Sequence, residues 1–450
     1  MELPEDLLAE ILCRLPPRSL AASQCVCKEW RSRRLLRADL LPLSLAGLFI
    51  HYNDLRFPDF FSRPSLTPTI SGKFDFLPVE EELHSIYAIT DHCNGLLMLP
   101  NVVVNPVTRR WTHLPPLPFA KLDEGFFEEQ FIVFDPTLSS HYDVFNIPFV
   151  SIRQYVVNRM DPVLKESEWP PSPLVLRVFS SMTGRWEERP FIRKGDAAGT
   201  VADAQNRWRG GNRYGNVYWR GALYVNTNCT MRISLSDGKY QVIQHPVIYT
   251  SDRRPNVFIG KSEKGVYLAS IGGIDCCLSI WVLNESCGHF EWVLKHKNNI
   301  MPLLLRLNRK QLHGPWILQD TNYHLYSQKF PGDWDLDDWD YDPSNFNSPN
   351  GNVEPLVENN FEWDSDDDDD DDDDGISDNH DGIAYYKNEL KFLGFHPYKE
   401  VVFFSSLTIK GLAYHLNSSK LQPLGNLSPK DYEHFSRDED ILRAFPYTPC

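Results

Sequence analysis

The sequence predicts an α+β multidomain protein, in which three short N-terminal helices precede a larger all-β repeat domain. Apolar residues recur at helical spacing near the N-terminus, short β-type runs begin at about residue 45, and an acidic segment interrupts these runs. With 450 residues, 42% of them hydrophobic, the chain is long enough for two or three folded units. We expect boundaries at 1–42, 43–332, 333–382 and 383–450.

The first predicted helix begins near Pro4 and ends before Pro16 and Pro17. Proline suits the first turn of a helix, and Glu5 and Asp6 place negative charge at the positive end of the helix dipole. The apolar residues of this helix fall on one stripe and comprise Leu7, Leu8, Ile11, Leu12 and Leu15. The two prolines cannot continue the helix, so it stops sharply.

Two further short helices are predicted before residue 40. Ser19 is a plausible N-cap for the helix that contains Leu20, and Val26, Cys27 and Trp30 form the apolar face of the next one. Forty residues are too few to bury all of these side chains, and some apolar surface is left over. Such surplus surface predicts a helical segment that binds a partner.

The order of these residues resembles the F-box, and its plant version in particular. The resemblance is carried by Leu3-Pro4, Leu7-Leu8, Glu10-Ile11-Leu12, Arg14-Leu15-Pro16, Ser19-Leu20, Val26-Cys27-Lys28 and Trp30-Arg31. It implies docking on a Skp-type adaptor, which joins a cullin-RING assembly. The implied adaptor-contacting or helix-sealing residues are Leu3, Pro4, Leu7, Leu8, Ile11, Leu12, Leu15, Pro16, Leu20, Val26, Cys27 and Trp30. The alternative is an ordinary amphipathic helical cap on a larger domain.

The composition argues against several classes of protein. The chain starts with acidic residues and contains no apolar run of roughly eighteen residues, so neither secretion nor a membrane span is expected. Its nine cysteines are scattered without a Cys-x-x-Cys pair, which fits a reducing compartment and predicts no disulfide framework and no zinc site. We expect a protein of the cytoplasm, the nucleus or both, without a metal or cofactor.

The net charge of −16 comes from one segment. Residues 333–381 contain 21 Asp and Glu and no Lys or Arg, so the rest of the chain has 40 acidic against 45 basic residues. The run Asp366 to Asp374 is unbroken, and like charges repel, so we predict a disordered insertion. A tolerated surface loop is one interpretation. A binding segment for a basic partner, or a kinase target at Ser365 or Ser377, is the other.

A two-part β unit occurs five times after residue 45. In each copy a short apolar strand, often after glycine, is followed by a second strand that turns tightly and returns toward a large residue, called here the return residue. The copies span 93–111, 142–186, 221–240, 265–294 and 401–421. Weaker candidates are 48–52 and 316–319. The return residues are Trp111, Trp186, Tyr240, Trp292 and Leu421, separated by 75, 54, 52 and 129 residues.

Two of these intervals are near fifty residues, which is typical of propeller blades, in which a recurring aromatic packs against the next blade. We therefore predict a propeller-like domain of about six to seven blades. A β-sandwich and a jelly roll are the alternatives. The segments 93–97 and 104–111 also resemble the F-box-associated repeat domains of plant proteins.

No catalytic motif is found in the sequence, so we expect a protein that is not an enzyme. There is no Gly-rich phosphate loop, no Gly-x-Ser-x-Gly elbow and no His-Glu-x-x-His. His92 next to Cys93 is interpreted as structural, because only Asp91 nearby could orient the imidazole.

Residues 207–220 are the best candidate surface for recognising an acceptor protein. Arg, Trp and Tyr dominate binding hot spots, and the candidate residues are Arg207, Trp208, Arg209, Arg213 and Tyr214. Structural packing is the alternative, and single-stranded nucleic acid is an unlikely partner.

Two functions follow from these features. The first is a substrate-recognition subunit of a Skp-cullin-F-box ubiquitin ligase that holds an unknown acceptor. The second is a non-catalytic β-propeller scaffold that directs no ubiquitination.

Overall fold

The computed structural model describes residues 45–449, apart from gaps at 54, 65–69, 78–86, 119–124, 152–159, 208–214, 228, 247–255, 273–275, 287, 308–313, 327–389, 407–409 and 433–439. The predicted N-terminal helices, with every residue predicted to contact the adaptor, lie outside the described residues. The acidic segment 333–382 lies outside them as well. The described part of the chain is mostly β-sheet with few helices.

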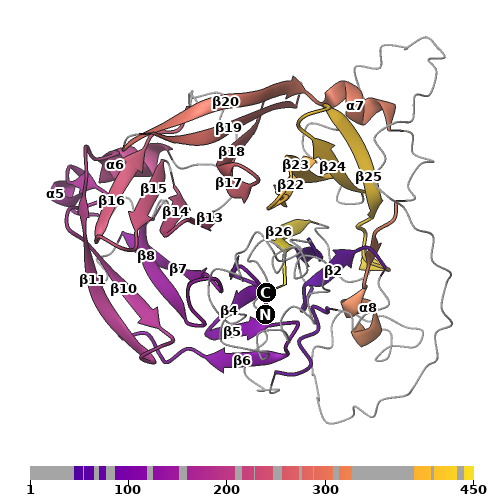
Figure 1. The fold of residues 1–450 in the computed structure, drawn as a ribbon, viewed down its shortest axis with the longest axis horizontal. Coiled ribbons are helices and arrows are strands. Elements are labelled where there is room, and N and C mark those ends of the chain that lie inside the picture. The colour runs from indigo at the N-terminus through magenta and orange to yellow at the C-terminus, as the bar shows by residue number, and fades with distance from the viewer. Residues whose placement is uncertain are drawn as a thin grey trace, which may run out of the picture.

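The sheets stand side by side in a ring around a common centre (Figure 1). The described residues form four separate four-stranded sheets, an eight-stranded sheet and a two-stranded sheet. The eight-stranded sheet consists of two antiparallel four-stranded halves, so six four-stranded units follow one another around the ring.

The first unit combines strands from both ends of the described chain. Its order is β21-β2-β1-β26, with β1 at Gly47–Tyr52, β2 at Asp59–Ser62, β21 at Ile317–Leu318 and β26 at Ile441–Tyr447. The register of β1 with β26 pairs Phe49 with Phe445. The last strand thus completes the unit that the first strand begins, which closes the ring.

The second unit is a meander with tight turns. It comprises β3 at Asp91–Cys93, β4 at Leu96–Leu99, β5 at Val102–Asn105 and β6 at Arg110–His113. Asn94 and Gly95 connect β3 to β4 with φ angles of 43° and 91°, the positive values that a tight hairpin requires. Between β5 and β6, Oδ1 of Asn105 accepts from the amides of Val107 and Thr108 at 3.1 Å, which stabilises the turn between these strands.

The eight-stranded sheet contains the third and fourth units. The third comprises β7 at Phe126–Phe134, β8 at Tyr142–Val150, β10 at Leu174–Ser180 and β11 at Arg185–Arg193. The fourth comprises β13 at Asn216–Trp219, β14 at Ala222–Asn226, β15 at Thr230–Ser234 and β16 at Lys239–Ile243. A short parallel pairing of β11 with β16, at Ile192 with Lys239 and Arg193 with Tyr240, joins the two halves.

A small satellite packs beside this sheet. It comprises α5 at Pro162–Lys165, β9 at Glu168–Trp169, β12 at Gly199–Thr200 and α6 at Val201–Arg207. Its apolar cluster comprises Val150, Met160, Trp169, Val201 and Ala204. The connections on either side of β10 and β11 therefore fold against each other.

The fifth and sixth units are antiparallel meanders. The fifth comprises β17 at Asn256–Ser262, β18 at Gly265–Gly272, β19 at Cys277–Ser286 and β20 at His289–Asn299. The sixth comprises β22 at Leu390–Phe395, β23 at Val401–Ser406, β24 at Lys410–His415 and β25 at Lys420–Asn426. Helices α7 at Met301–Arg306 and α8 at Thr321–Tyr326 lie in the connection between these units, on either side of β21.

The core consists of apolar layers between neighbouring units. One cluster joins Tyr267 and Ile280 of the fifth unit to Phe404 and Tyr414 of the sixth. Strand β23 is buried at all of its positions, because a neighbouring unit covers each face. This explains its continuous apolar run, since a strand covered on both faces has no side that requires polar residues.

Each of the five predicted repeat copies falls within one antiparallel unit of the ring. The two weaker candidates, 48–52 and 316–319, belong to a single further unit, in β1 and β21. The return residues differ in exposure. Trp111 is 36% exposed, in strand β6, whose residues are all exposed, whereas Tyr240 and Trp292 are buried.

Candidate functional site

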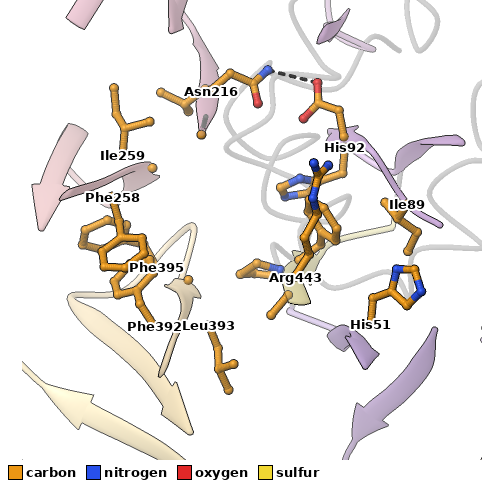
Figure 2. Close-up of a pocket in the computed structure, with 18 of the residues that line it drawn as sticks. His51, Ile89, His92, Asn216, Phe258, Ile259, Phe392, Leu393, Phe395 and Arg443 are labelled. Carbon is orange, nitrogen blue, oxygen red and sulfur yellow. Dashed lines mark hydrogen bonds between the residues drawn. The ribbon is translucent and has the colours of Figure 1, made fainter. Parts of the chain in front are cut away.

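A cavity of about 590 Å³ lies at the centre of the ring. Its walls are built mainly from β3, β13, β17, β22 and β26, so strands far apart in the sequence contribute to one site (Figure 2). Strand β7 supplies none of the lining residues, but its Ile132 donates a backbone hydrogen bond to Asp91. This volume is typical of small-molecule sites.

One wall of the cavity is apolar and aromatic. Phe258 of β17 stacks on Phe392 of β22, with ring centroids 4.3 Å apart and planes 12° from parallel. Phe395 meets Phe392 edge-on at 5.2 Å. Figure 2 shows these rings together with Ile259 and Leu393, away from the polar side chains. Ring pairs in such geometries are more stable than their buried area alone predicts, so this wall is well defined.

Asp91 anchors the opposite, polar wall. Its Oδ2 accepts from the amide of Ile132 at 2.7 Å and from Nδ2 of Asn216 at 3.0 Å (Figure 2). Burial raises the pKa of Asp91 to about 7, although these hydrogen bonds and the charge of Arg443 act in the opposite direction. The desolvation of a charged carboxylate therefore dominates, and the group can gain or lose a proton near neutral pH.

Arg443 of β26 extends into the same region of the cavity (Figure 2). Its Nη1 donates to the backbone carbonyl of Thr90 at 3.0 Å. His51 lies nearby, and burial lowers the pKa of His51, with a smaller effect of the same sign from the charge of Arg443. Arg443 contributes a positive charge to this wall.

His92 and Cys93 are adjacent in sequence but do not form a reactive pair. Burial lowers the pKa of His92 to about 4 and raises the pKa of Cys93 to about 12. The Cys93 thiol donates to the carbonyl of Phe134 at 3.3 Å. A neutral thiol beside a neutral imidazole is a poor nucleophile, in agreement with the structural interpretation of these residues.

Lys261 of β17 is the second cation of the cavity. Its Nζ donates to Oδ1 of Asn94, and Nδ2 of Asn94 donates to the carbonyl of Phe134 at 2.7 Å. Burial lowers the pKa of Lys261, while the charge of Asp135 acts in the opposite direction. The turn that Asn94 makes with Gly95 therefore also positions this lysine.

The structure only partly describes the candidate acceptor segment. Arg207 is the last residue of α6, while Trp208, Arg209, Arg213 and Tyr214 lie outside the described residues. The next described residues, Gly215 and Asn216, line the cavity. Acceptor binding at this segment stays a prediction.

Most of the cavity residues have no distinguishing pattern in the sequence. Lys261, Phe258, Phe392 and Arg443 lie on strands with no motif around them, and only the closure of the ring brings them together. The available local signal was Asp91 to Asn94, a polar group that interrupts an apolar repeat copy.

The described residues contain neither a metal-binding cluster nor a membrane-spanning helix. Within the described ranges, no group of three or more His, Cys, Asp or Glu is arranged to hold a metal ion. In the same part of the chain, no helix has the length and apolar character needed to cross a bilayer.

Comparison with known proteins finds a family match at the N-terminus and plant relatives over longer stretches of the chain. Residues 1–33 match the F-box domain. Over 211 residues the chain is 28% identical to an Arabidopsis thaliana protein named as an F-box/kelch-repeat protein, covering 42% of this chain and 46% of that protein. Over 229 residues it is 27% identical to an Arabidopsis thaliana protein named as an F-box protein, covering 46% of this chain and 53% of the relative.

A third relative is the F-box protein ETP2 of Arabidopsis thaliana, which is 32% identical over 132 residues, or 24% of this chain and 33% of that protein. The chain thus spans about half the length of the first two relatives and a third of the last. The F-box match at residues 1–33 and these plant relatives together support an F-box protein.

Proposed function

We propose that this chain is the substrate-recognition subunit of a Skp-cullin-F-box type ubiquitin ligase. The observation that carries the proposal is the F-box match at residues 1–33, followed by a separate β-sheet ring with its own core and a central cavity. One part docks on the ligase, and the other holds a target protein.

The F-box half binds a Skp-type adaptor and, through it, a cullin-RING assembly. The residues proposed to contact the adaptor or seal the helices include Leu12 and Leu15, which lie on the apolar stripe of the first predicted helix. An aspartate at either position would introduce a charge that the apolar interface cannot solvate.

The β half is proposed to be a six-bladed propeller. Six four-stranded antiparallel units arranged around one centre support this interpretation, as does the pairing of the first strand with the last. A closed ring leaves few unpaired edges, which suits a rigid platform for a partner.

The acceptor is proposed to bind where residues 207–214 join the ring. Asn216, close behind this segment, lines the cavity and is fixed by its hydrogen bond to Asp91. The segment combines arginines with aromatic residues, the types enriched in binding hot spots.

The chain contributes proximity rather than chemistry. Holding the acceptor beside the ubiquitin-loaded enzyme raises the effective concentration of its lysines, so no catalytic group is required here. The proposed location is the cytoplasm, the nucleus or both, where ligases of this type would meet their acceptors.

Co-purification tests this proposal. The full chain should retain a Skp-type adaptor, and Leu12→Asp with Leu15→Asp should abolish retention without changing the unfolding transition of the ring. An acceptor should accumulate in cells when residues 1–42 are deleted. Replacing Arg207, Trp208 and Arg213 should release that acceptor while the adaptor stays bound.

The alternative is a non-catalytic β-propeller scaffold that directs no ubiquitination. Adaptor binding without any protein that accumulates after the deletion would favour this scaffold. If the wild-type chain does not bind the adaptor, both the ligase role and the F-box interpretation of residues 1–33 are contradicted.

A further inference from the structure

Two cations of the central cavity hydrogen-bond to neutral oxygens rather than to carboxylates. Lys261 donates to the amide oxygen of Asn94, and Arg443 donates to the carbonyl of Thr90. By contrast Lys391, which also lines the cavity, forms an ion pair of 2.8 Å with Asp440. Neither Lys261 nor Arg443 has a carboxylate within 4.0 Å among the described residues.

The acidic groups around these cations are already engaged. Asp91 accepts hydrogen bonds from Ile132 and Asn216. Asp135, whose charge acts on Lys261, accepts from the backbone amide of Thr137 at 3.0 Å and from the hydroxyl of Tyr218 at 3.3 Å. A cation taken out of water without a close counterion is unfavourable, so the arrangement favours an anion from outside the chain.

His92 adds a group without a partner. Its Nδ1 is buried and makes no hydrogen bond within the part of the chain that the structure describes. Burial lowers the pKa of His92 to about 4, so the imidazole is neutral near pH 7, and Nδ1 of a neutral imidazole accepts a hydrogen bond in one of its two tautomers. A buried polar atom of this kind is unfavourable unless a ligand or water satisfies it.

The aromatic wall lies across the cavity from His92 and Arg443. Figure 2 shows Phe258, Phe392 and Phe395 on one side and His92 with Arg443 on the other. The cavity volume of about 590 Å³ accommodates a ring-sized molecule with a short polar arm. The two walls therefore differ in the chemistry that they can bind.

We propose that the central cavity binds a small organic acid, with its carboxylate on Lys261 and Arg443 and its apolar body against Phe258 and Phe392. A hydroxyl beside the carboxylate donates to Nδ1 of His92. The occupant is a free small molecule, so this site is distinct from the proposed acceptor surface and does not depend on the F-box.

The test uses the purified full chain and four probes in isothermal titration calorimetry. The probes are 3-phenylpropionate, 3-phenyllactate with its additional hydroxyl, the neutral 3-phenylpropionamide, and inorganic phosphate. We expect saturable binding of both carboxylates, tighter binding of 3-phenyllactate, and affinities at least about tenfold weaker for the amide and for phosphate. Equal binding of the amide, preferential binding of phosphate, or no binding of either carboxylate would overturn the proposal.

Variants then assign the site. Lys261→Met should weaken 3-phenylpropionate binding about tenfold, whereas Lys420→Met, at an exposed lysine at the start of β25, should leave it unchanged. Equal losses in the two variants would place the probe elsewhere and overturn the assignment. If Lys261→Met does not fold, Arg443→Met and the comparison of probes on the wild-type chain decide the outcome.

Discussion

Asn216 donates a 3.0 Å hydrogen bond to the carboxylate of Asp91, although 125 residues separate them in the chain. The same carboxylate oxygen accepts from the backbone amide of Ile132 in β7. Asp91 of β3 therefore links β7 and β13, which belong to different halves of the eight-stranded sheet. This link has consequences for stability that can be measured.

Replacing Asn216 with alanine removes one of the donors to a buried carboxylate. We expect a loss of about 1–3 kcal/mol in the free energy of unfolding, because the acceptor is left partly unsatisfied. Urea unfolding checks this value. The control is Asn284→Ala, at an exposed position of β19, which should change stability by less than about 0.5 kcal/mol. Equal midpoints for Asn216→Ala and the wild type would contradict a stabilising role for the bond.

The raised pKa of Asp91 predicts a dependence of stability on pH. Its pKa in the folded chain is about 7, against an ordinary value of 3.8, so the folded state binds this proton more tightly. The stabilisation from this proton is complete below about pH 4 and is lost as the pH rises through about 7. Asp91→Asn removes the titration. The unfolding free energy of the variant should therefore rise relative to that of the wild type over this range.

The measurement is urea unfolding of both proteins between about pH 5 and pH 8. His92, whose pKa is lowered to about 4, is present in both proteins, so its own contribution cancels in the difference between them. The difference between variant and wild type should grow by up to about 1.4 kcal/mol per pH unit and level off above the pKa. A difference that is constant, or that shrinks as the pH rises, would contradict the raised pKa.

The closure of the ring depends on Tyr447 of β26. This side chain is 1% exposed, its hydroxyl donates to the carbonyl of Gly95 at 3.0 Å, and its ring meets Phe49 edge-on at 5.3 Å. Tyr447→Ala should destabilise the fold by about 3–5 kcal/mol, and Tyr447→Phe by about 1 kcal/mol. Thermal or urea unfolding distinguishes the two.

A neighbour on the same strand provides the control. Leu442 is 53% exposed, so Leu442→Ala should change stability by less than about 0.5 kcal/mol. If both alanine variants lost the same stability, β26 would contribute through its backbone alone, and the proposed role of the Tyr447 side chain in closure would be wrong.

Local patterns in the sequence were sufficient to predict the meanders. Asn94 and Gly95 favour a tight hairpin, Asn105 favours a turn, and both lie between paired strands. The predicted copies fall within antiparallel units because neighbouring strands pair through short turns. Local patterns do not specify which distant strand completes a unit, so the pairing of β26 with β1 and the parallel contact of β11 with β16 were not predicted.

The cavity was not predicted for the same physical reason. Lys261 and Arg443 resemble surface residues in their own strands, and they are brought together only when the ring closes. Composition alone singles out the segment 207–220, of which residues 215–218 line the cavity. Composition therefore indicated a region of interest, while the identity of the cavity residues required the tertiary structure.

Gly260 of β17 lies against Phe395 of the aromatic wall. A Cβ at this position would lie 2.6 Å from Cδ2 of Phe395, which is closer than side chains tolerate. Gly260→Ala should therefore destabilise the fold by about 1–3 kcal/mol through overpacking. Phe395→Leu alone should also destabilise it, because apolar contacts with Phe392 and Tyr267 are lost.

Combining the two substitutions tests whether they act through one contact. With leucine at position 395 the added methyl group has room, so the double variant should be more stable than the sum of the single losses by about 0.5–3 kcal/mol. Urea unfolding of the four proteins measures this coupling. Strictly additive losses would mean that the strand shifts to admit the methyl group, and that Gly260 and Phe395 do not act through one contact.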